Sequence, residues 1–227
     1  MWYNRIIEIT DRNDFMENST NGKIMRFCGL LGVISLLSYT AAVIFSPLAY
    51  PDYNWLAQAV SDLSADSAPS RILWNQLSSL YGPCGIVSIM AVCVAVEKSR
   101  YKLLKIGIYL FAAMEWVSSV GYTMYPLSDA GTPNGFQNVM HLVVTGAVVV
   151  LSIASLVVIF IGTRKNELKI LGNLALAAVI LMTLGAIGTG AMPKEYFGIP
   201  ERFSVFAAAG FNAILGIWLF RGKLCEK

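Results

Sequence analysis

The sequence predicts an all-α integral membrane protein: a six-transmembrane-helix bundle with both termini in the cytoplasm and a short interfacial helix in the first outer loop. Three observations support this fold class: the composition, six apolar stretches, and the sided placement of the basic residues. Hydrophobic residues make up 56% of the 227-residue chain and charged residues only 14%, against about 25% charged residues in soluble domains. Such a chain has too little polar surface to face water on all sides, so lipid must be its main solvent.

Six stretches are long enough to cross a bilayer, which takes about 20 mainly apolar residues. They cover residues 24–45, 74–96, 103–124, 136–162, 168–191 and 201–220. The fourth stretch exceeds the required length, as a tilted or projecting helix does. We expect one membrane domain over 24–220, a cytoplasmic N-terminal tail or interfacial helix over 1–23, and a cytoplasmic tail over 221–227.

Lys and Arg residues give the orientation, because loops on the cytoplasmic side of a membrane protein are enriched in them. Of the 17 basic residues, only Arg71, Lys194 and Arg202 fall on one side of the predicted spans. The remaining basic residues lie in the termini and in the two short loops on the opposite side. That opposite side is therefore predicted to be cytoplasmic.

The first outer loop, residues 46–70, carries apolar residues at helical spacing. They are Trp55, Leu56, Ala59, Val60 and Leu63. The spacing places them on one face of a short helix. We expect a lid that lies in the membrane interface; the alternative is a solvated loop with one turn of helix.

The fifth predicted helix is rich in small residues, which let helix backbones approach closely. They are Gly172, Ala175, Ala178, Gly185, Gly188 and Gly190. Packing within the bundle explains them, and a homodimer through this helix is the alternative.

Polar residues inside the third helix form a seam that opens toward the outer side. Glu115 lies near mid-depth, and Ser118, Ser119 and Tyr122 follow on the same face. A carboxylate at this depth is costly, so such a residue faces the bundle interior, pairs, or takes up a proton.

The fourth helix has a matching seam of Asn134, Asn138, His141 and Thr145, and His141 is the only histidine of the chain. Because a short outer loop joins these two helices, we expect them to be antiparallel neighbours. A Glu115–His141 pair, with a polar residue of the sixth helix completing the cluster, is then sterically allowed. The functional interpretation is a polar cavity with a proton-exchanging pair; the structural interpretation is a hydrogen-bonded knot between helices.

Several kinds of chemistry find no residues in this sequence. One histidine and four cysteines without a CxxC pair do not provide the ligands of a catalytic zinc, which normally include two or more histidines. No phosphate-binding glycine loop, GxSxG motif or basic stripe with interleaved aromatics is present. We expect no cofactor, no metal site and no nucleic-acid partner.

Two outer stretches carry recognisable motifs: Tyr50-Pro51-Asp52-Tyr53, Gln58 to Ala65 and Pro69 in the first, and Tyr125-Pro126, Asp129, Gly131 and then His141 in the second. On these motifs the chain resembles a family of bacterial and archaeal six-span membrane proteins catalogued as a domain of unknown function. The likeness spans residues 25–220, although the family usually has glycine where Ser64 stands. The resemblance implies a bacterial or archaeal cytoplasmic membrane.

Ser61-Asp62 in the first outer loop and His141 early in the fourth helix form a second pattern. In this pattern the chain distantly resembles the six-span damage-regulated autophagy modulators and the lipid-remodelling factor that acts after GPI attachment. This resemblance implies a role that involves lipids.

Our leading functional prediction is a lipid-binding or lipid-handling protein with an outward-facing polar cavity, whose partners are membrane lipids. The predicted binding residues are Ser61, Asp62, Ser118, Tyr122, Asn138, His141, Thr145 and Asn212. On this placement, replacing Glu115 or His141 by alanine abolishes lipid binding.

Two other classes of function remain open. An intramembrane lipid hydrolase or transferase would use His141 as general base, aided by Glu115, with Asp62 or Asp129 near the headgroup. A proton-coupled transporter would use Glu115 as proton carrier. Against this function, the sequence shows no inverted repeat and no pair of broken helices, and Pro83 in the second helix is the one kink signal.

Overall fold

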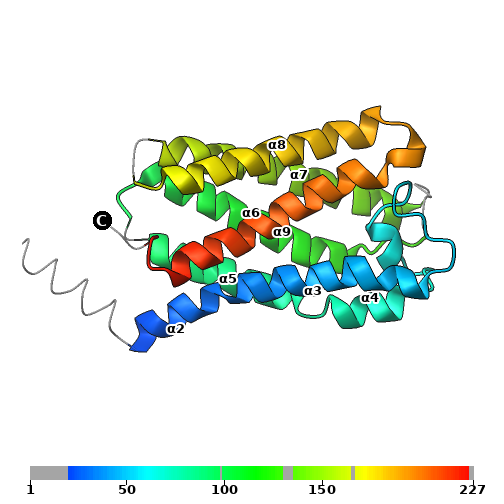
Figure 1. Cartoon of the computed structure of the whole chain (residues 1–227), viewed down its shortest axis with the longest axis horizontal. Coiled ribbons are helices and arrows are strands. Elements are labelled where there is room, and N and C mark those ends of the chain that lie inside the picture. Colours follow the sequence, from blue (N-terminus) through cyan, green and yellow to red (C-terminus); the bar gives the residue numbers. More distant parts are fainter. Residues whose placement is uncertain (1–19, 98, 130–134, 165–166, 225–227) are drawn as a thin grey trace, which may run out of the picture.

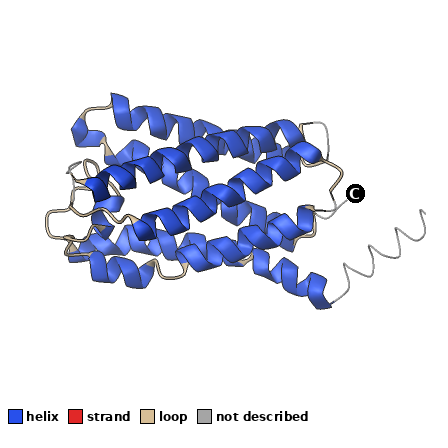
Figure 2. Ribbon diagram, turned by 180° about the vertical axis from the view of Figure 1, so that it is seen from behind, coloured by secondary structure: helices blue, strands red, loops and turns tan. Residues whose placement is uncertain are grey.

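A computed structural model describes residues 20–97, 99–129, 135–164 and 167–224. These residues form an elongated bundle whose helices run along its long axis (Figure 1). The view from behind shows the described chain built of helices and loops (Figure 2). Six helical segments of the described chain are long and apolar enough to cross a membrane, which confirms the predicted all-α bundle of six membrane-spanning helices.

The helices closely follow the predicted spans. Four spans are single helices: α6 (Lys102–Met124), α7 (Phe136–Thr163), α8 (Lys169–Ala191) and α9 (Gly198–Phe220). The other two are each divided: α2 (Thr20–Gly29) with α3 (Leu31–Phe45), and α4 (Arg71–Leu77) with α5 (Tyr81–Val96). Three short 3-10 helices lie in loops: η1 (Ser46–Ala49), η2 (Ser61–Ser64) and η3 (Lys194–Tyr196). Residues 1–19 of the predicted tail or interfacial helix (1–23) lie outside the described residues.

The helices pack mainly against their neighbours in sequence. The most extensive contact is between α6 and α7, as expected for antiparallel helices joined by a short loop. In addition, α8 packs on α7 and α9, while α3 packs on α5 and α9. We name the end with residues 46–70, 125–129 and 192–197 the loop end, and the end with residues 99–101, 164 and 167–168 the basic end (Figure 1). In Figure 1 the loop end lies opposite α2 and the C-terminus.

The second span is interrupted between α4 and α5 rather than merely kinked at Pro83. Pro83 lies in the first turn of α5, where its missing N–H leaves no helical hydrogen bond unmade. Two serines of α3 bond to carbonyls at the interruption: Ser38 Oγ donates to Leu77 O at 2.5 Å, and Ser35 Oγ donates to Tyr81 O at 2.6 Å. The serines thereby hold the start of α5 against α3.

The small residues of α8 pack against other helices of the same chain. A Cβ atom at Gly188 would lie 2.5 Å from Pro200 Cβ, and one at Gly185 would lie 2.5 Å from Pro200 O. Ala175 and Ala178 are buried as well. A homodimer through α8 would therefore not use these four residues, whereas Gly190 has no neighbour within 4 Å and is exposed.

The predicted short helix over residues 55–63 is wrong, because this segment forms turns and then η2. Asn54 and Gln58 account for the difference. The Gln58 side chain accepts the Asn54 N–H at 2.7 Å, and the Asn54 side chain accepts the Leu56 N–H at 3.1 Å. Such local side-chain hydrogen bonds compete with helical ones. Val60 and Leu63 are buried, whereas Trp55 is 56% exposed.

The core of the basic half is apolar and closely packed. Phe111 of α6 and Phe211 of α9 are fully buried with ring centroids 5.5 Å apart. Gly29 and Gly216 let the α2–α3 junction touch α9 directly, since a Cβ atom on Gly29 would lie 2.5 Å from Gly216 O. Without an apolar driving force between lipid and helix, close packing of this kind is what holds membrane helices together.

Candidate functional site

The first outer loop is docked onto the N-terminal end of α9. The Gly198 N–H donates to Leu56 O at 2.8 Å. A side chain at position 198 would collide with backbone oxygens of the loop, since a Cβ atom there would lie 2.5 Å from Gln58 O. Glycine is therefore required at the point where the loop crosses the start of α9.

Arg202 of α9 fixes the loop through three hydrogen bonds. Its Nη1 donates to Gly198 O at 2.7 Å and to Gln58 O at 3.2 Å, and its Nη2 donates to the Tyr53 hydroxyl at 2.8 Å. The Tyr53 hydroxyl in turn donates to Ala59 O at 2.8 Å. Burial raises the pKa of Tyr53 to about 12, although the neighbouring guanidinium acts in the opposite direction.

Two carboxylates accept backbone N–H groups of the same loop. Glu201 Oε2 accepts from Val60 N at 2.6 Å, and Asp62 Oδ2 accepts from Ala59 N at 3.0 Å. Ser61 contributes a further backbone hydrogen bond to Glu201. Asp62 is buried. The predicted binding residues Ser61 and Asp62 thus take part in folding the loop.

A second connection ties the first outer loop to the α6–α7 loop. The N–H groups of Asp66 and Ser67 donate to Leu127 O at 2.8 Å and Ser128 O at 3.1 Å. Asn138, at the start of α7, accepts the Ser128 N–H through its side-chain oxygen at 2.8 Å. The loop end is therefore one hydrogen-bonded cap rather than several independent loops.

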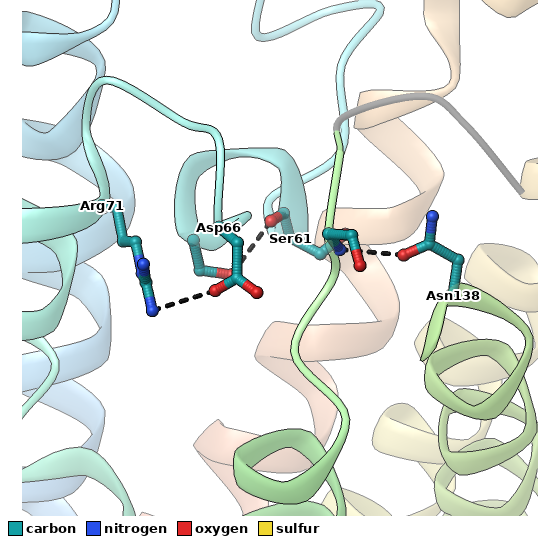
Figure 3. Close-up of polar contacts among 6 residues, drawn as sticks. Ser61, Asp66, Arg71 and Asn138 are labelled. Carbon is teal, nitrogen blue, oxygen red and sulfur yellow. Dashed lines mark hydrogen bonds and ion pairs between the residues drawn. The ribbon is translucent and has the colours of Figure 1, made fainter. Parts of the chain in front are cut away.

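Figure 3 shows the polar contacts around this connection, with Asn138 reaching the loop from α7 and Arg71 facing Asp66. The Arg71–Asp66 ion pair is 2.9 Å long, and its side chains are 49% and 39% exposed. Asp129, a predicted site residue, is exposed on the α6–α7 loop. Asn134 lies outside the described residues.

His141 forms a compact group with the end of α6. Its Nδ1 lies 2.9 Å from Tyr125 O, so this nitrogen must donate and carry the proton. The Tyr122 ring lies against the imidazole at 5.0 Å between centroids, and the Tyr122 hydroxyl donates to Thr145 Oγ1 at 3.1 Å. Thr145 Oγ1 donates to His141 O at 2.9 Å. The predicted residues Tyr122, His141 and Thr145 are thus brought together.

Glu115 lies in a different group, surrounded by α3, α5 and α9. Asn212 forms a side-chain hydrogen bond with Glu115 and donates from Nδ2 to Gly85 O at 3.2 Å. Ser118, one turn from Glu115 on α6, bonds to the Tyr81 hydroxyl. All three predicted residues, Glu115, Ser118 and Asn212, are buried.

The structure does not pair Glu115 with His141. Each has its own set of partners, and no ion pair or hydrogen bond joins His141 to a carboxylate among the described residues. A hydrolase that uses His141 as general base would therefore not be aided by Glu115. The described residues also contain no group of three or more His, Cys, Asp or Glu side chains that could hold a metal ion.

A groove opens on the outside of the bundle beside the docked loop. It has a volume of about 300 Å³ and is lined by Val43, Ile44, Pro47, Tyr53, Trp55 and Arg202. The apolar lining residues come from the end of α3, from η1 and from the loop, while α9 contributes the guanidinium. A positive charge thus lies in a mainly apolar recess.

Residues 33–218 match the family model described as "Protein of unknown function (DUF998)". The chain belongs to the DUF998 family. No curated protein and no solved structure matches it. The resemblance to the autophagy modulators and the lipid-remodelling factor therefore stays a prediction.

In this DUF998 protein, sequence reasoning missed Tyr53, Glu201 and Arg202 as site residues. Arg202 entered only the count of basic residues, and Glu201 was not considered. A signal was present: two adjacent opposite charges directly after Pro200, in the first turns of a predicted membrane helix, are costly unless they have partners. Their partners, backbone groups of a loop about 140 residues earlier, are visible only in the fold.

Proposed function

We propose that this DUF998 protein binds an amphiphile with an anionic headgroup, a membrane lipid, in the groove at the loop end. The observation that carries the proposal is the combination of Arg202 with four apolar side chains in one recess. Guanidinium groups bind phosphate and carboxylate oxygens through paired N–H donors. The apolar side chains suit the part of the lipid that joins headgroup and acyl chains.

Arg202 retains donors for such a ligand. A guanidinium has five N–H groups, and the hydrogen bonds to Gly198, Gln58 and Tyr53 use three of them. Among the described residues these bonds leave two N–H groups for a headgroup. The bonds already made hold the guanidinium in place, which lowers the conformational entropy lost on binding.

The surface beside the groove suits acyl chains. Ile44, Phe45 and Leu48 are 59%, 50% and 82% exposed and lie next to it at the end of α3 and in η1. Trp55 is 56% exposed at its edge, and tryptophan favours the level of the headgroups. A volume of about 300 Å³ is at the lower end for ligand pockets, so it accommodates a headgroup while the chains remain in the bilayer.

Lipid retention measured by native mass spectrometry tests the proposal. The full-length protein is equilibrated with phosphatidylglycerol or with phosphatidylcholine. We expect the wild type to retain phosphatidylglycerol preferentially and Arg202→Gln to lose about tenfold in affinity, as the loss of a charge-assisted hydrogen bond of about 1.4 kcal/mol implies.

Arg71→Gln is the matched control, because Arg71 lies at the same end but outside the groove. It should leave the preference unchanged, and so should His141→Ala, since His141 does not line the groove. Equal loss in Arg71→Gln and Arg202→Gln would reduce the effect to general surface charge and contradict the proposal. Loss in His141→Ala alone would return the site to the position expected from the sequence.

The proposal includes an orientation: the loop end faces away from the cytoplasm of a bacterial or archaeal cell. It rests on the basic residues gathered at the opposite end. Single cysteines at Tyr196 and Glu167, in a background with the native cysteines removed, test it with a membrane-impermeant maleimide on intact cells. Labelling at 196 and protection at 167 is the expected result; the reverse would overturn the orientation.

A further inference from the structure

A second polar site, independent of the groove, lies inside the bundle around Glu115. Four helices contribute to it: Ser35 from α3, Gly85 from α5, Glu115 from α6 and Asn212 from α9. The side chains of Ser35, Glu115 and Asn212 converge on Gly85, which has no side chain of its own. A Cβ atom there would lie 3.1 Å from Ser35 Oγ, 3.4 Å from Asn212 Nδ2 and 3.6 Å from Glu115 Oε2.

Asn212 has an acceptor without a donor. Its Nδ2 is directed to Gly85 O, which fixes the orientation of the amide. Among the described residues its Oδ1 has no hydrogen-bond partner, and Asn212 is only 2% exposed, so water does not supply one freely. Leaving a buried acceptor unsatisfied is costly, so a donor is expected next to it.

The neighbouring carboxyl group can provide this donor in one protonation state. An ionised carboxylate has only acceptors, whereas a protonated carboxyl group has one O–H donor. We propose that Glu115 binds and releases a proton, and that the protonated carboxyl group donates its O–H to Asn212 Oδ1. The proton ligand is the only co-reactant, and no other bond is made or broken.

The surroundings contain no fixed positive charge that would hold a carboxylate ionised. The titratable groups within electrostatic reach of this site are hydroxyls: Tyr81 from α5, Tyr122 from α6 and, through Tyr81, Tyr39 from α3. From α9 the group facing Glu115 is the neutral amide of Asn212. No positively charged side chain among the described residues therefore faces Glu115, and a proton is the simplest way to neutralise its carboxylate.

The tyrosines around the site extend toward the loop end, whereas on the basic side the Ser88 hydroxyl, one turn after Gly85 on α5, donates to Gly29 O at 3.1 Å. Toward the loop end, the Tyr81 and Tyr39 rings lie 4.6 Å apart, and Tyr39 is within electrostatic reach of both Glu201 and Arg202. Toward the basic end, Phe111 and Phe211 are fully buried against each other. Protons should therefore exchange with the loop end.

Infrared difference spectroscopy of the full-length protein in nanodiscs, between acid and alkaline buffer, tests the site. We expect a carboxylic C=O band that appears on acidification in the wild type and is missing in Glu115→Gln. Asp129→Asn, which removes an exposed carboxylate at the loop end, is the control and should keep the band. Identical difference spectra for wild type and Glu115→Gln would overturn the proposal.

A second variant keeps the test informative should Glu115→Gln fail to fold. In Asn212→Leu the carboxyl group loses its acceptor, so the same band should shift to higher frequency. An unshifted band would contradict the assigned hydrogen bond. A band that responds to NaCl at constant pH, and not to pH, would assign the site to Na⁺ and overturn the proton assignment.

The direction of access is tested by the rate at which this band shifts after transfer to D₂O. Tyr81→Phe and Tyr39→Phe should slow the shift several-fold, while Tyr109→Phe, near the basic end of α6, should not. Unchanged rates in both loop-end variants would refute the access route. Glu115, Asn212 and Tyr81 do not line the groove, so lipid retention measured on these variants distinguishes failure here from failure of the proposed function. Tyr39 is not used for this comparison, because it packs with Val43 of the groove and is within electrostatic reach of Arg202.

Discussion

The two halves of the bundle interior differ in emphasis, although Ser88 of α5 also bonds across helices in the basic half, to Gly29 O. In the basic half, buried hydroxyls such as those of Ser155 and Thr163 donate to carbonyls of their own helix, and side chains such as Phe111 and Phe211 fill the space between helices. In the loop half, buried polar side chains bond across elements, as Asn138 does to the α6–α7 loop and Arg202 does to the first outer loop.

This difference shows where polarity has a tertiary role. A serine hydroxyl that donates to a carbonyl of its own helix needs no partner on another helix. Neighbouring helices can then pack against it by shape alone. A polar group bonded to another element specifies which element that must be. The basic half thus closes the bundle, while the loop half fixes the cap and holds the two proposed sites.

The largest expected effect comes from breaking close packing in the basic half. Gly216→Val places methyl groups where the backbone of Gly29 lies and should destabilise the protein by about 3 kcal/mol or more, because the obstacle is backbone that cannot rotate away. Thermal unfolding in detergent measures the effect. Gly210→Val, on the same helix but with open space around it, is the control and should unfold near the wild-type temperature. Equal stability of the two variants would refute the close contact.

A smaller loss is expected from a cavity in the same half. Phe111→Ala leaves a void of about 100 Å³, which costs about 2 kcal/mol. The transfer contribution known from soluble proteins is reduced in lipid, so the loss of packing dominates. Trp116 of α6 is 48% exposed, so Trp116→Ala should lower the stability clearly less in the same unfolding assay. The reverse order would show that the basic half is not tightly packed.

The third prediction concerns the cap. Tyr53→Phe removes one hydroxyl that both accepts from Arg202 and donates to Ala59, and should weaken loop docking by about 1 kcal/mol. Proteolysis of the loop in folded protein measures the docking. Tyr50→Phe, at the neighbouring ring, should leave the cleavage rate near that of the wild type.

The same hydroxyl gives loop docking a pH dependence. The raised pKa of Tyr53, about 12 in the docked loop against about 10 for an exposed tyrosine, means that only the undocked loop ionises between these values. Docking is therefore fully stabilised below pH 10 and is weakened as the pH rises toward 12. Wild-type loop cleavage should accelerate in this window, and Tyr53→Phe should lose that dependence. An identical acceleration in both proteins would contradict it.

The smallest effect is expected at the exposed ion pair of the cap. Arg71→Gln removes the bond to Asp66, and because both side chains are well exposed the loss should stay below about 0.5 kcal/mol. Unfolding in low and high salt checks this, since any difference should vanish as salt rises. A loss as large as that of Phe111→Ala would mean that the cap, and not the basic half, limits stability.

The sequence predicted the spans well and the loop poorly. Span boundaries follow from apolar runs such as 103–124, which depend on composition along the chain and need no partner. The helix expected over 55–63 failed because Asn54 and Gln58 provide local hydrogen bonds that the apolar spacing does not reveal.

Among the site residues, the seams on the third and fourth helices were predicted as buried, and Tyr122, His141 and Thr145 indeed meet. The pairing of Glu115 with His141 was not found. Helical spacing shows which face a residue shares, but it does not show which of several neighbouring helices that face meets. Glu115 faces α5 and α9, whereas His141 faces the end of α6.

The sequence by itself determined the solvent, the number of helices and the residues too polar to face lipid, because each of these follows from composition and period along one segment. Only the tertiary structure decided which polar groups satisfy one another. Arg202 binds a loop about 140 residues earlier in the chain, and Asn212 is left beside Glu115 with one acceptor unpaired. Hydrogen bonds act over about 3 Å in space, and sequence separation carries no information about that distance.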